Sequence, residues 1–275
     1  MTSLRVVIDG LGPWDVAIEE QGPTDGEVVM LIHGSGPGAS AAGAWRATLP
    51  ALAERYRVIA PDLLGFGKTA AAPDGRHDRE RWIAQLRAVI GAIDAPRVHL
   101  VGSSLGGGLA LHLALQKADR VDRIALISPL GSAFPITEGL DRVWGYEPSL
   151  PAMDALMHTF VYDASGVSPD IVQLRYQNSL LTQQAYRGMF PAPRQRWVDD
   201  YALTTEQLAS SVRPILIFHG REDQVVPLAS SQALSAELPH AQLVVIDHCG
   251  HWAQIEHAPQ VNAALIDFFD YRPVG

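Results

Sequence analysis

The stretch from Arg97 to Gly108 constrains the fold of this chain more than any other part of its sequence. An apolar, β-branched run ends at Gly102, and an apolar pattern with helical spacing begins at Leu109. Between them lies a G-x-S-x-G motif with Ser104 at its centre. A strand that becomes a helix within so few residues must bend sharply, and glycines on both sides remove the Cβ atoms that would clash in the bend. The motif therefore predicts a serine hydroxyl raised at the carboxyl edge of a sheet.

In that position the hydroxyl of Ser104 would lie beside a helix N-terminus, whose free N–H groups favour negative charge. The neighbouring Ser103 cannot take the central place, because Val101 and Leu105 stand where the motif needs glycines. Clusters of glycine and serine at strand ends are usually only turns. The rest of the chain must therefore decide whether Ser104 is a nucleophile.

Composition limits the partners and the compartment. The 275 residues allow one large α/β domain or two small ones, and the net charge of −9 argues against binding to nucleic acid or to an anionic membrane surface. The single cysteine, Cys249, excludes an internal disulfide framework and suits a reducing compartment. The N-terminus lacks the apolar region of a signal peptide, and no apolar run approaches the roughly 18 residues of a membrane helix. We expect a cytoplasmic protein, with assembly into a homo-oligomer left open.

Strand-like and helix-like segments alternate along most of the chain, which predicts a mostly parallel central sheet with helices on both faces. Two short strands near the N-terminus are expected to pair in antiparallel fashion at a sheet edge. The expected strands cover residues 6–10, 14–19, 28–32, 57–60, 97–102, 124–127, 214–218 and 242–246, and the expected helices cover residues 45–55, 79–93, 230–238 and 259–269.

The pattern changes between residues 131 and 212. Strand-like runs are missing there, and aromatic and methionine residues collect. Aromatic and methionine residues that collect in this way most often form the buried face of helices. This segment is therefore expected to be a helical cap with an apolar inner face. It would be inserted into an α/β core made of residues 1–130 and 213–275.

Two further polar residues each follow an expected strand. Asp223 comes after the strand at 214–218, and His251 comes after the strand at 242–246 in a glycine-flanked loop. Both would lie at the same sheet edge as Ser104, where open α/β sheets build their sites. A serine hydroxyl needs a base to take its proton and an acid to orient that base. Ser104, His251 and Asp223 are therefore the predicted nucleophile, base and acid.

The glycine-rich loop at residues 33–38 would complete such a site. Backbone N–H groups of Ser35 and Leu105 could converge on an oxyanion that develops during attack. The same loop matches a dinucleotide-binding G-x-G-x-x-A pattern, but Pro37 removes an N–H group and no helix follows promptly. A zinc site at His248, His251 and His257 lacks the required spacing. No metal and no cofactor is expected.

With these motifs in place the chain resembles the α/β-hydrolase superfamily, and within it most closely the meta-cleavage product hydrolases. The order Ser104, Asp223, His251 matches that superfamily. The segments that carry the closer resemblance are His33–Ala39, Gly102–Gly107 and Cys249–Ala258. The resemblance implies an α/β-hydrolase fold with an inserted helical cap, and a hydrolase that splits a carbon–carbon bond in ring-fission products of aromatic degradation.

The resemblance also implies substrate-binding residues. Arg175 would hold the carboxylate of a small, partly apolar substrate, and Trp252 would line the pocket beside the base. The other implied binding residues are Gly34, Gly36 and Ser103. Ser103 and Ala47 stand where the family usually has asparagines, so a carboxylesterase or lactonase that acts on small hydrophobic esters remains the alternative. A further alternative is a non-catalytic receptor that keeps the same pocket for ligand binding. The intact predicted triad argues against it, because such a receptor would not need one.

Overall fold

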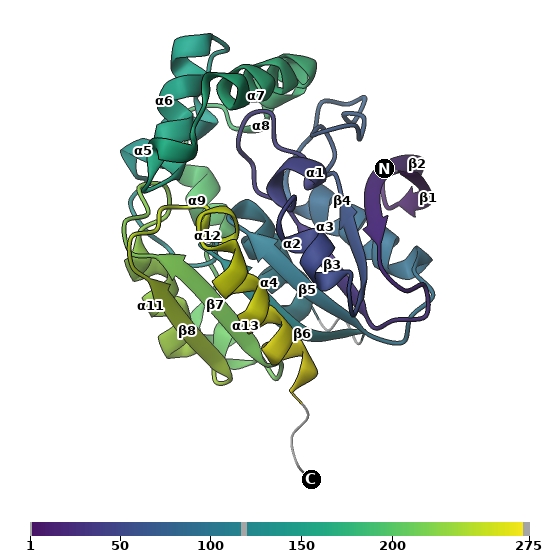
Figure 1. Cartoon of the computed structure of the whole chain (residues 1–275). Helices are drawn as coiled ribbons and strands as arrows, with labels where there is room; N and C mark the ends of the chain where they lie inside the picture. Colours follow the sequence, from purple (N-terminus) through teal and green to yellow (C-terminus); the bar gives the residue numbers. More distant parts are fainter. Residues whose placement is uncertain (1, 117–119, 272–275) are drawn as a thin grey trace.

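The computed structural model describes residues 2–116 and 120–271 of the chain. Its centre is an eight-stranded sheet with the strand order β1-β2-β4-β3-β5-β6-β7-β8 (Figure 1). Strand β2 runs antiparallel to β1 and β4, and all other neighbouring strands are parallel. The strands are β1 Thr2–Ile8, β2 Gly12–Gln21, β3 Val28–Ile32, β4 Arg57–Pro61, β5 Val98–Ser103, β6 Val121–Ile127, β7 Ile215–Gly220 and β8 Ala241–Ile246. The expected mostly parallel sheet with an antiparallel edge is confirmed.

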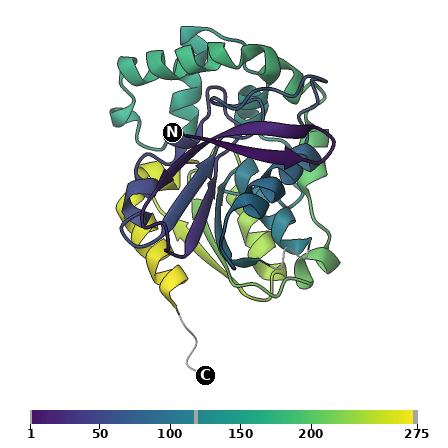
Figure 2. The same cartoon turned by 90° about the vertical axis from the view of Figure 1, so that its right-hand side faces the viewer.

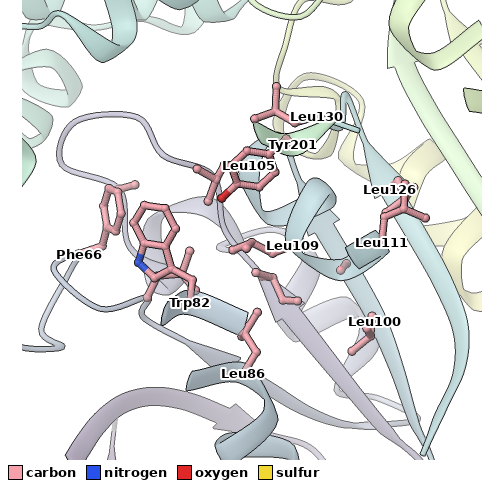
Figure 3. Close-up of a cluster of buried hydrophobic side chains, with 14 of the residues drawn as sticks. Phe66, Trp82, Leu86, Leu100, Leu105, Leu109, Leu111, Leu126, Leu130 and Tyr201 are labelled. Carbon is pink, nitrogen blue, oxygen red and sulfur yellow. The ribbon is translucent and has the colours of Figure 1, made fainter. Parts of the chain in front are cut away.

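Burial on both faces explains why the central strands are continuous apolar runs. All five residues of β3 are buried, and its Met30 and Leu31 point into different clusters on opposite faces of the sheet. Helices α3 (Arg79–Ala92), α4 (Leu105–Leu115) and α11 (Leu228–Glu237) cover one face. Helices α2 (Thr48–Leu52) and α13 (Ala258–Asp270) cover the other. Figure 3 shows part of the first cluster, in which Phe66 and Trp82 of the α3 side lie near Leu105 and Leu109 of α4.

Two helices differ from the prediction. Instead of one helix over residues 45–55, the chain forms α1 (Ala41–Ala44) and α2, because the Ser40 hydroxyl caps an earlier start by accepting the Gly43 N–H at 3.2 Å. Trp45 between them is fully buried, so the chain turns there to insert the indole into the core. Helix α4 begins at Leu105 rather than at Leu109, and its first turn therefore contains the glycines that had been expected to precede it.

Between β6 and β7 the chain contains helices and no strand. They are α5 Glu138–Trp144, α6 Leu150–Phe160, the 3₁₀ helix η1 Ala164–Gly166, α7 Pro169–Leu181, α8 Gln183–Met189, α9 Gln195–Tyr201 and α10 Thr205–Ala209. Figures 1 and 2 show α5 to α8 gathered at the end of the molecule opposite the C-terminus. The division of the chain into a core and a cap stays a prediction. The remaining helix, α12 (Ala253–Glu256), directly precedes α13, and no described helix is long and apolar enough to span a membrane.

Candidate active site

Ser104 occupies the turn between β5 and α4. Its backbone has φ 56° and ψ −120°, a left-handed conformation that is strained for a residue with a side chain. The turn is tight, because a Cβ atom on Gly102 would lie 2.3 Å from the carbonyl oxygen of Gly106. The strain is held by hydrogen bonds: the Ser104 N–H donates to the Ile127 carbonyl at 2.8 Å, and the Leu130 N–H donates to the Ser104 carbonyl at 3.2 Å. This is the geometry that the G-x-S-x-G motif predicted.

The expected acid and base are in contact. Nδ1 of His251 lies 2.7 Å from Oδ2 of Asp223, and both side chains are buried. The other carboxylate oxygen of Asp223 accepts the N–H groups of Val225 and Val226 at 2.8 and 3.0 Å. With Nδ1–H directed at the carboxylate, Nε2 of His251 is left as the acceptor, which is the tautomer that a general base needs.

Electrostatics favour an ionised acid. Burial alone would raise the pKa of the Asp223 carboxyl, but the charge and hydrogen bond of His251 outweigh that effect, with help from His219 and the Val225 N–H. The pKa of Asp223 is consequently lowered. An ionised Asp223 can stabilise the positive charge that His251 gains when it takes a proton.

His219 is a second histidine at this carboxylate, and the sequence did not single it out. Its Nε2 lies 2.9 Å from the Val226 carbonyl and 3.4 Å from Oδ2 of Asp223, and its Nδ1 lies 2.7 Å from the Ser231 hydroxyl. Burial lowers the pKa of His219, which favours the neutral ring. From the sequence, a histidine inside an apolar strand is expected to be an ordinary residue of the core. Its polar contacts come from the loop and helix that follow the strand, and the strand sequence does not show them.

A cavity of about 120 Å³ joins most of the predicted site residues. Apolar side chains from α5 and α6 line one part of it, including Leu140, Val143, Met157 and Phe160. The predicted residues that line it are Gly34, Ser35, Gly36, Ser103, Ser104, Arg175, His251 and Trp252. Leu105 is the residue that follows Ser104 at the start of α4, and Asp223 lies behind His251. The structure thus brings residues from distant parts of the chain together around one cavity, and their catalytic and binding roles stay predictions.

The glycine loop that follows β3 lies directly beside Ser104. A Cβ atom on Gly34 would be 3.1 Å from the Cβ atom of Ser104. The buried His33 holds the loop, since its Nδ1 lies 2.8 Å from the Gly34 carbonyl and its Nε2 accepts the Leu63 N–H at 3.0 Å. Burial lowers the pKa of His33, in keeping with the neutral ring that these two bonds require. The loop is therefore placed to bring the Ser35 N–H toward the reacting centre, a role that stays a prediction.

Trp144 links this loop to the helical segment. Its indole Nε1–H donates a hydrogen bond to the Ser35 hydroxyl at 2.9 Å, and its ring stacks on Phe190 with centroids 4.7 Å apart. The sequence placed Trp144 only among the aromatic residues of segment 131–212. The hydrogen bond joins residues 109 positions apart, so no local pattern could have indicated it.

Arg175 of α7 lines the same cavity and contacts the glycine loop. Its Nε–H donates to the Pro37 carbonyl at 2.8 Å, and its guanidinium lies 5.3 Å from the centroid of the Trp252 ring. No Asp or Glu among the described residues forms an ion pair with it. Burial lowers the pKa of Arg175 to about 10, so the group is still a cation at neutral pH. A partly buried cation without an acidic partner among the described residues, in a largely apolar cavity, is suited to bind a carboxylate.

The alternatives for the same segment find no geometric support. No group of three or more His, Cys, Asp or Glu side chains in the described part of the chain could hold a metal ion. Nε2 of His257 instead lies 3.0 Å from the His248 carbonyl. Cys249 is buried, and burial raises the pKa of its thiol, so it is a poor nucleophile.

Comparison with known proteins agrees with this geometry. Residues 27–258 match the family described as "alpha/beta hydrolase fold". The chain is 44% identical over 242 residues to a 2-hydroxymuconate semialdehyde hydrolase of Pseudomonas sp. (strain CF600), which covers 87% of this chain and 86% of the relative. It is 45% identical over 233 residues to a 2-hydroxy-6-oxo-2,4-heptadienoate hydrolase of Pseudomonas putida F1, covering 84% of each.

A solved structure gives the same picture. A mutant of the meta-cleavage product hydrolase from Pseudomonas fluorescens IP01, complexed with acetates, superposes with a TM-score of 0.92. The two proteins are 42% identical, and the match covers 97% of each chain. The fold and the family resemblance predicted from sequence are confirmed.

Proposed function

The chain belongs to the α/β-hydrolase fold family, among the meta-cleavage product hydrolases, and from this premise we propose that it cleaves a carbon–carbon bond in a 2-hydroxy-6-oxo-dienoate. The observation that carries the proposal is the unpaired Arg175 in the same cavity as Ser104 and His251. An ester hydrolase needs the nucleophile and its base. A cation without an acidic partner in the same cavity is expected where the substrate brings an anion.

Each of the residues that line the cavity has its own role in this reaction. Arg175 binds the carboxylate at one end of the substrate, and the apolar side chains of α5 and α6 take the rest of the molecule. His251, oriented by Asp223, helps move a proton from the dienol hydroxyl onto the carbon beside the ketone. That carbon can then leave as a stabilised carbanion equivalent when the ketone carbon is attacked.

The attack consumes one water. Ser104 or a water molecule, deprotonated by His251, adds to the ketone carbon, and the oxyanion is stabilised by the N–H groups of Ser35 and Leu105. The carbon–carbon bond breaks, its electron pair shifts through the conjugated chain to the 2-oxygen, and that oxygen takes the proton held by His251. The acyl group leaves as a carboxylic acid; where Ser104 was the attacker, the water first hydrolyses the acyl-enzyme with His251 as base. The products are a 2-hydroxydienoate and an acid, and the residues return to their starting protonation.

The test compares two substrates in the same variants. Arg175→Ala should lower kcat/KM for a 2-hydroxy-6-oxo-hexadienoate about 10- to 150-fold, the worth of a hydrogen bond to a charged group. Hydrolysis of p-nitrophenyl acetate, which has no carboxylate to place, should change little. Loss of the visible absorbance of the dienoate reports the first reaction.

Arg187→Ala is the matched control, because Arg187 lies on α8 of the same helical segment and pairs with Glu147 at the surface at 2.8 Å. It should leave both reactions unchanged. A wild-type enzyme that cleaves the ester but leaves the dienoate untouched would refute the carbon–carbon hydrolase and favour a carboxylesterase or lactonase, in line with Ser103 and Ala47.

A further inference from the structure

Glu256 of α12 connects the loop that carries His251 to the end of α6. The side chain is partly buried, and its two carboxylate oxygens accept hydrogen bonds from different parts of the chain. Oε1 accepts the N–H of Gly250, the residue before His251, at 2.8 Å. Oε2 accepts the N–H groups of Tyr162 and Asp163, just after α6, at 2.7 and 3.2 Å. One carboxylate thus joins the segment of the candidate base to a segment more than eighty positions away.

Further contacts show how closely these two segments pack. The His251 N–H donates to the carbonyl of Phe160, the last residue of α6, at 2.8 Å. The Phe160 ring stacks on the Trp252 ring with centroids 4.2 Å apart. A Cβ atom on Gly250 would lie 2.8 Å from the Phe160 carbonyl oxygen, so this approach requires glycine. Phe160 also lines the cavity, and the end of α6 is therefore both a wall of the cavity and a support of the base.

The opposite side of the same loop is held by the residues that follow β7. Asp223 contacts the imidazole at Nδ1. Glu222 accepts the Cys249 N–H with its carboxylate and donates its own N–H to the Cys249 carbonyl, both at 3.0 Å. These contacts hold the start of the loop and one ring nitrogen, whereas Glu256 and α6 hold the backbone at the base itself. A general base works only when such surrounding contacts keep it close to its productive position.

We propose that Glu256 is a positioning residue for His251, which it holds against the end of α6 through the Gly250 N–H. The inference rests on the proposed function, because it takes His251 as the base that deprotonates Ser104. Hydrogen bonds from N–H groups to a carboxylate are charge-assisted and stronger than neutral ones. Without the carboxylate, the two segments lose their shared acceptor, and the loop can move away from α6 together with the imidazole.

Labelling of Ser104 by a fluorophosphonate tests this without the dienoate. The reagent forms a bond between Oγ and phosphorus and releases fluoride, while the hydroxyl proton passes to His251. The final amount of label counts the folded enzyme, and the rate constant reports how well the base activates the serine. Glu256→Ala should leave the final amount unchanged and lower the rate constant about 10- to 100-fold, because a misplacement of about 1 Å can cost about 10²-fold. For p-nitrophenyl acetate, kcat should fall by a similar factor with KM nearly unchanged.

Other variants separate this role from a purely structural one. Glu256→Gln keeps the length of the side chain but has a single acceptor oxygen, so it can serve only one of the two segments. Its rate constant should lie between those of the wild type and Glu256→Ala. Asp78→Ala is the matched control, because Asp78 also accepts a backbone N–H, that of Arg81 at 2.9 Å, but does not line the cavity. It should lower the melting temperature and leave the rate constant at the wild-type value.

Wild-type rate constants in both Glu256 variants would overturn the inference, even if the final amount of label fell, since that result describes a structural role alone. An equal decrease of the rate constant in Asp78→Ala would overturn it as well. Glu256→Gln gives the answer if Glu256→Ala does not fold. His251→Ala separates the inference from the proposed function: rapid labelling of this variant would overturn His251 as the base. Slow labelling of His251→Ala, with wild-type rates in the Glu256 variants, would overturn the positioning role only.

Discussion

Two adjacent serines at the end of β5 carry the same side chain, and only the backbone separates their chemistry. Ser103 is the last residue of the strand, whereas Ser104 has the left-handed φ of 56° that turns its hydroxyl out of the sheet. Both line the cavity. The candidate nucleophile is therefore defined by a conformation, which the flanking glycines make possible.

Ser104→Ala is expected to remove nearly all turnover of any ester, by about 10⁴- to 10⁶-fold, because the members of a triad act as a unit. Ser103→Ala is the matched control and should retain most of the activity. Initial rates with p-nitrophenyl acetate measure both. A larger loss in Ser103→Ala than in Ser104→Ala would show that the nucleophile has been assigned to the wrong serine.

For single residues, the sequence predicted those positions that follow from the order of the strands along the chain. The placement of Ser104, Asp223 and His251 near one edge of the sheet could be predicted because each follows its own strand, and parallel strands end at a common edge. The place of His219 at this carboxylate could not, since it depends on which groups the fold brings to the ring.

At the scale of elements, the start of α4 shows how closely a helix can lie against a sheet. A Cβ atom on Gly106 would lie 2.2 Å from the Ile32 carbonyl oxygen and 2.5 Å from that of His33. Glycine therefore lets the first turn of α4 touch the end of β3, where the glycine loop begins. The prediction placed the helix start at Leu109, where the apolar helical pattern begins. Glycine lowers helix propensity, and close packing overrides that tendency in the first turn of α4.

Gly106→Ala should destabilise the protein by about 1–3 kcal/mol, because the added methyl group overpacks this contact. Gly91→Ala is the opposite case: Gly91 lies in α3 with no atom within 4 Å of its Cβ position. It should stabilise the protein by about 0.5–1 kcal/mol through helix propensity. Urea unfolding measures both changes. Equal effects of the two substitutions would contradict the packing described here.

At the scale of the whole molecule, buried histidines set the response to acid. Burial lowers the pKa of His33, His112 and His219. The unfolded chain, in which histidine has a pKa of about 6.5, then binds more protons than the folded protein between that value and the folded pKa. The stability that these residues contribute is complete well above pH 6.5 and decreases as the pH falls toward their folded pKa values.

The free energy of unfolding should accordingly fall by about 1–3 kcal/mol between pH 7.5 and pH 5.5, at up to ~1.4 kcal/mol per pH unit for each such histidine. His112→Gln, which can still donate to the Tyr201 carbonyl that His112 contacts at 3.0 Å, should make this decrease smaller. His240→Gln, at an exposed position, is the control. Urea midpoints that are the same at both pH values would exclude a stabilising role for the neutral rings.

The fold as a whole was predictable because alternating strands and helices leave few ways to build a sheet. The segment between β6 and β7 was predictable only as helical. Its aromatic residues did not reveal that Trp144 would contact Ser35 or that Arg175 would cross the glycine loop, since both contacts join residues more than a hundred positions apart.

The spacing of the candidate triad along the chain also matters while the protein is being made. Translation proceeds from the N-terminus at about 5–20 residues per second, so roughly 7 to 30 s pass between the synthesis of Ser104 and that of His251. During that interval the nascent chain holds a serine with neither acid nor base. Because β7 and β8 are the last two strands in both sequence and sheet order, the candidate acid and base can join Ser104 only after both of these strands have been made.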